Sequence, residues 1–315
     1  MNNTGYVYDP VMARHKCIEL DGADHPEQPE RIHAIYKEML NQNLIQKMFP
    51  IKSRYATEEE ILLAHSQKYL NKLKSILTQK NEMKVAFRML NEFNSVYSNK
   101  YTLECAFLAA GSTIELVKNI CNGTIDNGVA IIRPPSHHAE RDEAMGFCFF
   151  NNTSLGAITA KNLGNKVAIV DFDVHHNNGT VDILKNTDIN LFSIHRHDNG
   201  KFYPGTGAVS NIKNVFNYPL NNVVAGDKEY LDIFNKYIIP KLNEDKPDII
   251  MVSAGFDAGI NDPLGGYAVT PQGYGQMVRL LKLITPKLCL VLEGGYNLET
   301  ISKSMCECTK VLLNN

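Results

Sequence analysis

The sequence predicts an α/β fold in which helices flank a mainly parallel β-sheet. Short runs rich in Val and Ile recur along the 315 residues, and such runs are typical of strands that are buried on both faces. Between several of them lie longer stretches with apolar residues at helical spacing. This alternation indicates right-handed βαβ crossovers, which produce a parallel sheet.

The expected elements follow from these runs. The N-terminal third is expected to be mostly helical, with one helix beginning after Pro29 and another around Glu58–Leu77. Strands are expected at 128–134, 166–174, 190–195, 248–257 and 288–296. Further helices are expected at Thr102–Asn119, Ser154–Leu163, Tyr230–Leu242 and Tyr274–Leu283. Because no repeat or low-complexity linker interrupts the pattern, residues 1–315 are predicted to form one domain.

The charge and composition disfavour several classes of protein. The net charge is −2, from 32 Lys and Arg against 34 Asp and Glu, and the absence of a basic block argues against nucleic-acid binding. The chain starts without a secretory signal and lacks the roughly 18 consecutive apolar residues of a membrane span. We therefore expect a cytoplasmic protein, or in a eukaryote a cytoplasmic or nuclear one. Seven cysteines without a C-x-x-C pair disfavour disulfides and a thiolate zinc site. The oligomeric state is left open.

Polar residues gather where the predicted strands end, which is where parallel sheets bind ligands. In VDFDVHHNNGT, Asp171, Asp173 and His175 alternate, so the pleat of a strand would point all three to one side. Another predicted strand ends at Asp257. Buried carboxylates need a partner or a metal, and two Asp with one His suit catalytic zinc or ferrous iron. The alternative is that these residues only cap a strand and solvate a loop.

Two other predicted strand ends make that alternative weaker. RPPSHHAE supplies the adjacent His137 and His138, and VLEGGYNL supplies Tyr296 beside two glycines. A histidine pair alone is more often structural. Together with the Asp-x-His segment, however, these residues indicate a catalytic site that is built from several strand ends.

An ordered series of motifs resembles one enzyme family from end to end. The motifs are TGYVYDPVMARH, HPEQPERI, RPPSHHAE, GFCFFNN, VDFDVHHNNGT, SIHRHDNGKFYPGTG, VSAGFDAGINDPLGG and LEGGYNLETIS. The chain resembles the zinc-dependent histone deacetylases and acetylpolyamine amidohydrolases, most closely the class II histone deacetylases. The resemblance implies an arginase/deacetylase-like three-layer fold. It also implies an enzyme that hydrolyses the amide of acetyl-lysine, or of another acyl-lysine, in a protein or peptide substrate.

The resemblance also implies the metal sites. Zinc would be held by Asp173, His175 and Asp257, and the sequence does not distinguish zinc from ferrous iron. A structural potassium ion is implied as well. Its site would comprise Asp171, Asp173, His175, Ser193 and Ile194.

Catalytic roles carry over in the same way. His138 would be the general base and acid, oriented by Asn178, because a histidine that titrates near neutral pH can take and return a proton. His137 would pair with Asp171 and help to stabilise charge. Tyr296 would donate its hydroxyl to the developing oxyanion.

The same resemblance implies an acyl-lysine channel. Phe147 and Tyr203 would form its aromatic walls, Gly146 would leave room beside them, and Leu264 would lie at the rim. Without the family match, core packing is the alternative for the two aromatic residues. Tyr203 stands where class II relatives usually have Phe, which leaves the acyl-chain preference open.

Two segments near the channel also depart from the family pattern. The segment 208–214 is shorter than in relatives, and Ser98-Asn99-Lys100 replaces a stretch that contains Cys-Pro. Recognition of a peptide is therefore left open.

Three other functions compete with protein lysine deacylation. An acetylpolyamine amidohydrolase is disfavoured by Leu264, because a polyamine-selective relative is expected to carry an acidic residue there. A non-catalytic acyl-lysine binding module is disfavoured because every expected catalytic residue is present. An arginase-like di-manganese hydrolase is disfavoured because His176-Asn177-Asn178 supplies too few carboxylates for a second metal.

Overall fold

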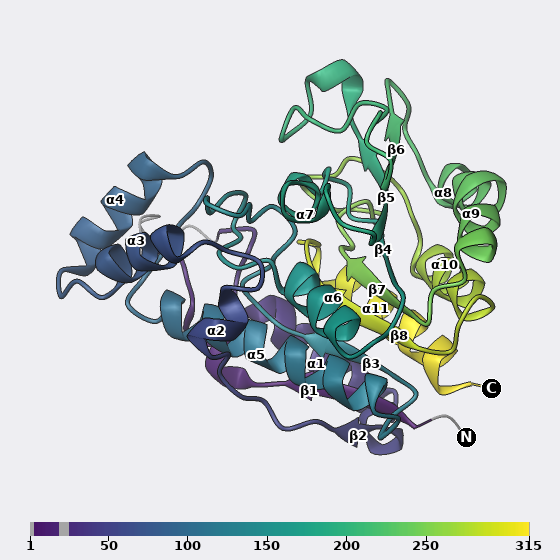
Figure 1. The fold of residues 1–315 in the computed structure, drawn as a ribbon, viewed down its shortest axis with the longest axis horizontal. Coiled ribbons are helices and arrows are strands. Elements are labelled where there is room, and N and C mark those ends of the chain that lie inside the picture. Colours follow the sequence, from purple (N-terminus) through teal and green to yellow (C-terminus); the bar gives the residue numbers. More distant parts are fainter. Residues whose placement is uncertain (1–2, 19–24, 315) are drawn as a thin grey trace.

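The computed structural model describes residues 3–18 and 25–314, whose strands form an eight-stranded, all-parallel sheet (Figure 1). The strands lie in the order β2-β1-β3-β8-β7-β4-β5-β6. Their bounds are β1 (Thr4–Tyr8), β2 (Phe49–Pro50), β3 (Asn127–Ile131), β4 (Val167–Asp171), β5 (Asn190–Arg196), β6 (Val215–Leu220), β7 (Ile249–Ala254) and β8 (Leu288–Leu292). Because all pairings are parallel, every strand ends at the same edge of the sheet.

Helices cover both faces of the sheet, which confirms the predicted α/β class (Figure 1). They are α1 (Glu30–Asn41), α2 (Glu58–Ile61), α3 (Gln67–Leu77), α4 (Glu82–Glu92), α5 (Thr102–Cys121), α6 (Asn152–Asn162), α7 (Asn178–Leu184), α8 (Asp227–Ile233), α9 (Ile239–Asp245), α10 (Pro271–Lys282) and α11 (Leu298–Leu313). Helices α5 and α6 pack together on one face, and α1, α10 and α11 pack together on the other. No described helix is both long and apolar enough to cross a bilayer.

The core lies between these layers. Every residue of β3, β4, β7 and β8 is buried, as the apolar runs predicted, because helices cover these strands on both sides. Helices α3 and α4 project beyond the sheet (Figure 1) and pack around a second apolar cluster that includes Leu73, Met89 and Phe150.

The central strands end earlier than the sequence predicted. β4 stops at Asp171 rather than at residue 174, β7 at Ala254 rather than at 257, and β8 at Leu292 rather than at 296. The pleat argument for Asp173 and His175 was therefore wrong, because both lie in the loop after β4. After each of these strands the chain leaves the sheet in a loop. In the loop after β8, Gly295 adopts a φ of +114°, a backbone conformation that glycine adopts readily.

Some elements differ from the expected ones. The helix predicted around Glu58–Leu77 is divided into α2 and α3, because the Ser66 hydroxyl accepts from the N–H of Tyr69 (3.1 Å) and starts a new helix. The helix predicted over Tyr230–Leu242 is interrupted by a π-helical segment, Phe234–Ile238, just before Pro240. Proline lacks the N–H of a regular helical turn, which accounts for the change of pitch.

Candidate active site

The predicted metal ligands, the histidine pair and Tyr296 lie in loops that follow four adjacent strands, β3, β8, β7 and β4. In that order the loops carry His137 and His138, then Tyr296, then Asp257, then Asp173 and His175. Parallel pairing brings the four loops to one edge, so residues up to 159 positions apart in the chain surround one space.

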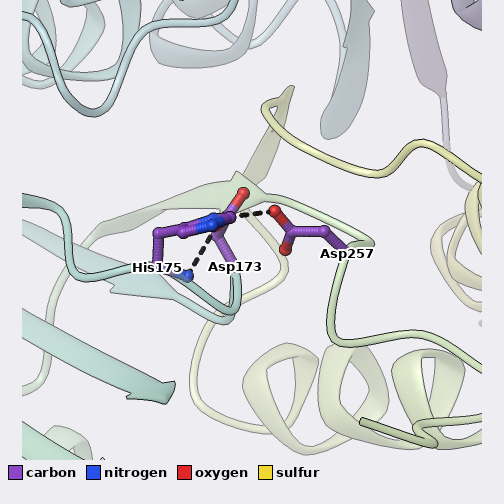
Figure 2. Close-up of side chains that lie close together, drawn as sticks. All are labelled: Asp173, His175 and Asp257. Atoms are coloured by element: carbon purple, nitrogen blue, oxygen red, sulfur yellow. Dashed lines mark hydrogen bonds and ion pairs between the residues drawn. The ribbon is translucent and has the colours of Figure 1, made fainter. Parts of the chain in front are cut away.

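Asp173, His175 and Asp257 form a buried cluster with one ligand atom of each within 4.8 Å of the others (Figure 2). The Nδ1 atom of His175 lies 3.0 Å from Asp173 Oδ1 and 3.0 Å from Asp257 Oδ2. The N–H of Gly294 donates to the second Asp173 oxygen (2.9 Å), and the N–H of Val174 donates to Asp257 (2.7 Å). A Cβ at Gly294 would overlap Asp257, so this approach of the backbone requires glycine.

The charges of this cluster fit a divalent cation. Burial and then the neighbouring Asp173 raise the pKa of Asp257 to about 7. Burial opposes protonation of His175, but Asp257 and Asp173 outweigh it and raise the pKa of His175 to about 9. Without a metal the cluster thus binds protons, and a cation would replace that positive charge. The Asp-His-Asp donor set suits zinc or ferrous iron.

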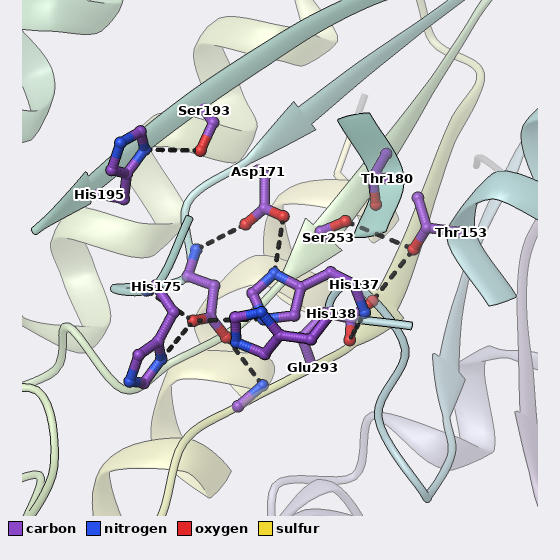
Figure 3. Close-up of polar contacts among 12 residues, drawn as sticks. His137, His138, Thr153, Asp171, His175, Thr180, Ser193, His195, Ser253 and Glu293 are labelled. Carbon is purple, nitrogen blue, oxygen red and sulfur yellow. Dashed lines mark hydrogen bonds and ion pairs between the residues drawn. The ribbon is translucent and has the colours of Figure 1, made fainter. Parts of the chain in front are cut away.

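The two adjacent histidines have different partners (Figure 3). His137 Nδ1 lies 3.0 Å from Asp171 Oδ2, and His138 Nδ1 lies 2.7 Å from Asn178 Oδ1. The amide nitrogen of Asn178 donates to Glu140 Oε1 (2.7 Å), so the amide oxygen is the atom that faces His138. An oxygen partner places a proton on Nδ1 of His138 and leaves Nε2 able to accept one.

These environments separate the pKa values of the two histidines. Burial would lower the pKa of His137, but the carboxylates of Asp173 and Asp171 outweigh it and raise that pKa well above its usual value. Burial, followed by the charges of His137 and His175, lowers the pKa of His138 well below its usual value. His137 therefore favours the charged form and His138 the neutral form, a division of roles typical of acid–base sites.

A cavity of about 250 Å³ leads to this cluster. It is lined by Ser95, His138, Gly146, Phe147, His175, Phe202, Tyr203, Leu264 and Tyr296. The Tyr203 ring meets the His138 ring edge-on at 5.3 Å, and the Phe147 ring meets that of Tyr296 at 6.2 Å. Gly146 has a φ of +53°, and a Cβ there would lie 2.8 Å from His138 Cγ. The channel residues named from the sequence thus line one cavity.

The loop that carries Tyr296 is held by residues that sequence reasoning missed. Asp262 accepts from the N–H of Tyr296 (2.7 Å) and of Leu264 (2.9 Å), which links the loop to the channel rim. Arg31 is fully buried and donates to the carbonyls of Gly295 (2.6 Å) and Glu293. Charged residues inside the motifs HPEQPERI, NDPLGG and LEGGY were the available signal.

Of the residues expected around potassium, Asp171 ends β4, Asp173 and His175 follow it, and Ser193 and Ile194 lie in the middle of β5. Asp171 pairs with Ser193 in the sheet register. The Oδ1 atom of Asp171 accepts from the N–H of Asp173 (2.9 Å). The hydroxyl of Ser193 lies 2.8 Å from His195 Nδ1 (Figure 3).

Comparison with known proteins gives the family. Residues 25–312 match the histone deacetylase domain. The chain belongs to the histone deacetylase family. It is 42% identical to histone deacetylase 5 of Arabidopsis thaliana over 330 residues, which cover 99% of this chain and 49% of that protein. It is 36% identical over 331 residues to polyamine deacetylase HDAC10 of Danio rerio, covering all of this chain and 48% of that protein.

A solved structure supports the same assignment. The crystal structure of the HDA15 HD domain superposes with a TM-score of 0.92 at 37% sequence identity, covering 99% of this chain and 89% of that one. The relatives are class II histone deacetylases, as the motifs predicted. The chain spans about half the length of the two curated relatives named above.

Proposed function

We propose that the chain is a metal-dependent deacylase that hydrolyses the amide of acetyl-lysine, or of another acyl-lysine, in proteins. One observation carries this proposal. His175 of the Asp-His-Asp cluster, His138 with an Nε2 able to accept a proton, and Tyr296 border the same cavity. These are the parts that hydrolysis of an amide needs.

His138 is the proposed general base and then general acid. A divalent cation held by Asp173, His175 and Asp257 would polarise the amide carbonyl and make a water more acidic. Nε2 of neutral His138 accepts the proton of the attacking water, while its Nδ1–H donates to Asn178. The same nitrogen then returns the proton to the leaving amine, which departs as a neutral lysine side chain.

His137 and Tyr296 stabilise the charge that develops during the reaction. Asp171 orients His137 and favours its protonated form, so a positive charge lies beside the reacting centre. Burial, followed by the charge of Asp257, raises the pKa of Tyr296 well above its usual value, so its hydroxyl keeps the proton that it donates to the oxyanion.

The channel suits an uncharged, apolar side chain. The rings of Phe147 and Tyr203 offer aromatic surface to the aliphatic stem of an acylated lysine. Leu264, which is 37% exposed at the rim, offers no negative charge to a cationic polyamine. These features favour acyl-lysine in a protein over a small acylated polyamine.

The test is turnover of an acetyl-lysine peptide by the purified protein with one equivalent of zinc. Wild-type protein is expected to release acetate. Tyr296→Phe is expected to lower kcat by about 100- to 1,000-fold, as loss of an oxyanion donor does. Tyr230→Phe is the matched control, because Tyr230 is buried and its hydroxyl has no hydrogen-bond partner within the described residues.

The peptide assay also separates catalysis from binding. His138→Ala is expected to abolish turnover while the peptide still binds. Binding without turnover by the metal-loaded wild-type protein would instead identify a non-catalytic acyl-lysine module.

A polyamine substrate is the second candidate, because one relative of 36% identity is named a polyamine deacetylase. Comparing kcat/KM for an acetyl-lysine peptide and for acetylputrescine decides between them. The rim chemistry of Leu264 predicts preference for the peptide, and preference for acetylputrescine would reverse the assignment.

The metal identities belong to the same proposal. We expect zinc, with ferrous iron as the alternative, and a potassium ion at Asp171 and Ser193. Reconstitution of metal-free protein with each ion, followed by the peptide assay, compares them directly.

A further inference from the structure

Glu293 is a buried carboxyl group that has no role in the reaction described above. It follows β8, is completely shielded from solvent, and lies beside the histidine pair (Figure 3). Its Oε2 accepts from the N–H of Ser136 (2.6 Å) and of His137 (3.0 Å). Its Oε1 accepts from the hydroxyls of Ser136 and Thr153, the latter at 3.1 Å. Four donors therefore converge on one side chain.

The backbone at Glu293 and Gly294 also makes hydrogen bonds to buried residues. Its carbonyl accepts from Arg31, and the next N–H, of Gly294, donates to the metal-cluster residue Asp173 (2.9 Å). The loop continues through Gly295 to Tyr296. One short segment thus connects the backbone of His137, the cluster at Asp173 and Tyr296, which lines the channel.

The two backbone donors explain why an oxygen acceptor is needed at this place. The N–H groups of Ser136 and His137 both donate to a fully buried carboxyl group, and a buried donor that loses its partner destabilises the structure. The two hydroxyls differ from them, since a hydroxyl can accept as well as donate. Only the Oε2 position must therefore be an acceptor.

This distinction holds whatever the charge of the group. Burial raises the pKa of Glu293 to about 7, although His137 opposes the shift. A proton on Oε1 would be donated to the Ser136 or Thr153 hydroxyl, and Oε2 would still accept from both N–H groups. A glutamine amide, with its NH₂ toward the hydroxyls, would reproduce the same pattern.

We propose that Glu293 is a positioning residue that fixes the His137–His138 segment relative to the loop of Tyr296, so that the general base and the oxyanion donor keep their separation. This inference rests on the proposed deacylase function. Because Glu293 does not line the channel, its removal affects the alignment of the reacting groups rather than substrate binding. Misplacement by about 1 Å can cost about 100-fold in rate.

The experiment compares three variants in steady-state hydrolysis of an acetyl-lysine peptide by zinc-loaded protein. Glu293→Ala is expected to lower kcat by about 10- to 100-fold, with KM within about threefold of wild type and one zinc per chain retained. Glu293→Gln is expected to restore kcat to within about threefold of wild type, because it keeps the acceptor and removes only the charge. Glu299→Ala, an exposed carboxylate six residues further on, is the matched control.

Each outcome is decisive. A kcat for Glu293→Ala equal to wild type would overturn the inference, and so would a parallel loss of zinc. A tenfold or greater loss in Glu293→Gln would also overturn it, since charge and not backbone anchoring would then be the role. Glu293→Gln remains informative if Glu293→Ala does not fold. Absence of turnover in the wild-type protein would instead refute the proposed deacylase function.

Discussion

Protons and metal compete for the side chains of Asp173, His175 and Asp257. The two carboxylates are fully buried and lie against the imidazole of His175, which lines the channel, so the positive charge there must come from a proton or from a cation. This explains why the pKa values of His175 and Asp257 are raised together. It also makes metal binding sensitive to pH in a direction that can be stated beforehand.

Zinc affinity is expected to fall as the pH is lowered from 9 to 6. Below a pKa of about 9 His175 holds a proton that zinc must displace, and below about 7 Asp257 holds one too. Binding should therefore release protons at pH 7. Competition with a chelating dye across this range measures the affinity, and an affinity independent of pH would contradict the description of the cluster.

The uncharged side chain of Leu264 lies at the rim of the channel, so a carboxylate placed there would give the rim a negative charge. Leu264→Glu is expected to raise the ratio of kcat/KM for acetylputrescine over that for an acetyl-lysine peptide by about tenfold, equivalent to about 1.4 kcal/mol, because a carboxylate attracts the distal ammonium group. Leu264→Gln is the control of similar size without charge. Equal ratios in the two variants would show that rim charge does not determine selectivity.

At the level of elements, one buried ion cluster connects α1 and the segment after β3 to the segment before α1. Glu27 lies between Arg133 (2.9 and 2.6 Å) and Arg31 (2.9 Å), and all three side chains are completely buried. Burial alone would raise the pKa of Glu27, but Arg133 and Arg31 outweigh it and hold that pKa well below its usual value of 4.5. Arg31 also supports the loop of Tyr296, so the cluster extends to the site.

Glu27→Gln is expected to lower the free energy of unfolding at pH 7 by about 3–5 kcal/mol, because two guanidinium groups remain buried without their counter-charge. The contribution of Glu27 is fully present above pH 4.5, its unfolded pKa, and is lost as the pH falls toward the much lower folded pKa. The wild type should therefore lose more stability than Glu27→Gln between pH 5 and pH 3. Urea titrations at these pH values measure it, and identical slopes would contradict it.

The sequence predicted those strands whose own residues form a recognisable apolar run. The five apolar runs became β3, β4, β5, β7 and β8, because strands covered on both faces are rich in apolar residues. The strands β1, β2 and β6 escaped prediction. They lie toward the edges of the sheet, where both residues of β2 are exposed and most of β6 is only half-buried, so the apolar signal is diluted.

The reacting residues of the site could be predicted from the sequence, but the residues that hold them in place could not. Asp173, His175 and Tyr296 stand in recognisable motifs, and the structure brings them together. Glu27 and Arg133 are 106 residues apart, and Glu293 and Ser136 are 157 apart. Contacts between residues so far apart in the sequence depend on the order of the strands in the sheet, and no local sequence pattern indicates them.

For the whole molecule, strand order is what turns separate motifs into one site. β8 and β7 come last among the strands in the chain but lie between β3 and β4 in the sheet. Tyr296 and Asp257 are thereby placed between the histidine pair and Asp173. The fold, more than any one motif, thus determines that a single cation would face both the base and the oxyanion donor.

The most direct test of this account is a titration of metal-free protein with zinc, in which acetyl-lysine peptide hydrolysis and bound metal are measured in the same samples. Activity is expected to rise in proportion to bound zinc and to reach its plateau at one equivalent, and Asp257→Asn is expected to weaken both. Hydrolysis at the full rate in protein without metal would contradict the central claim.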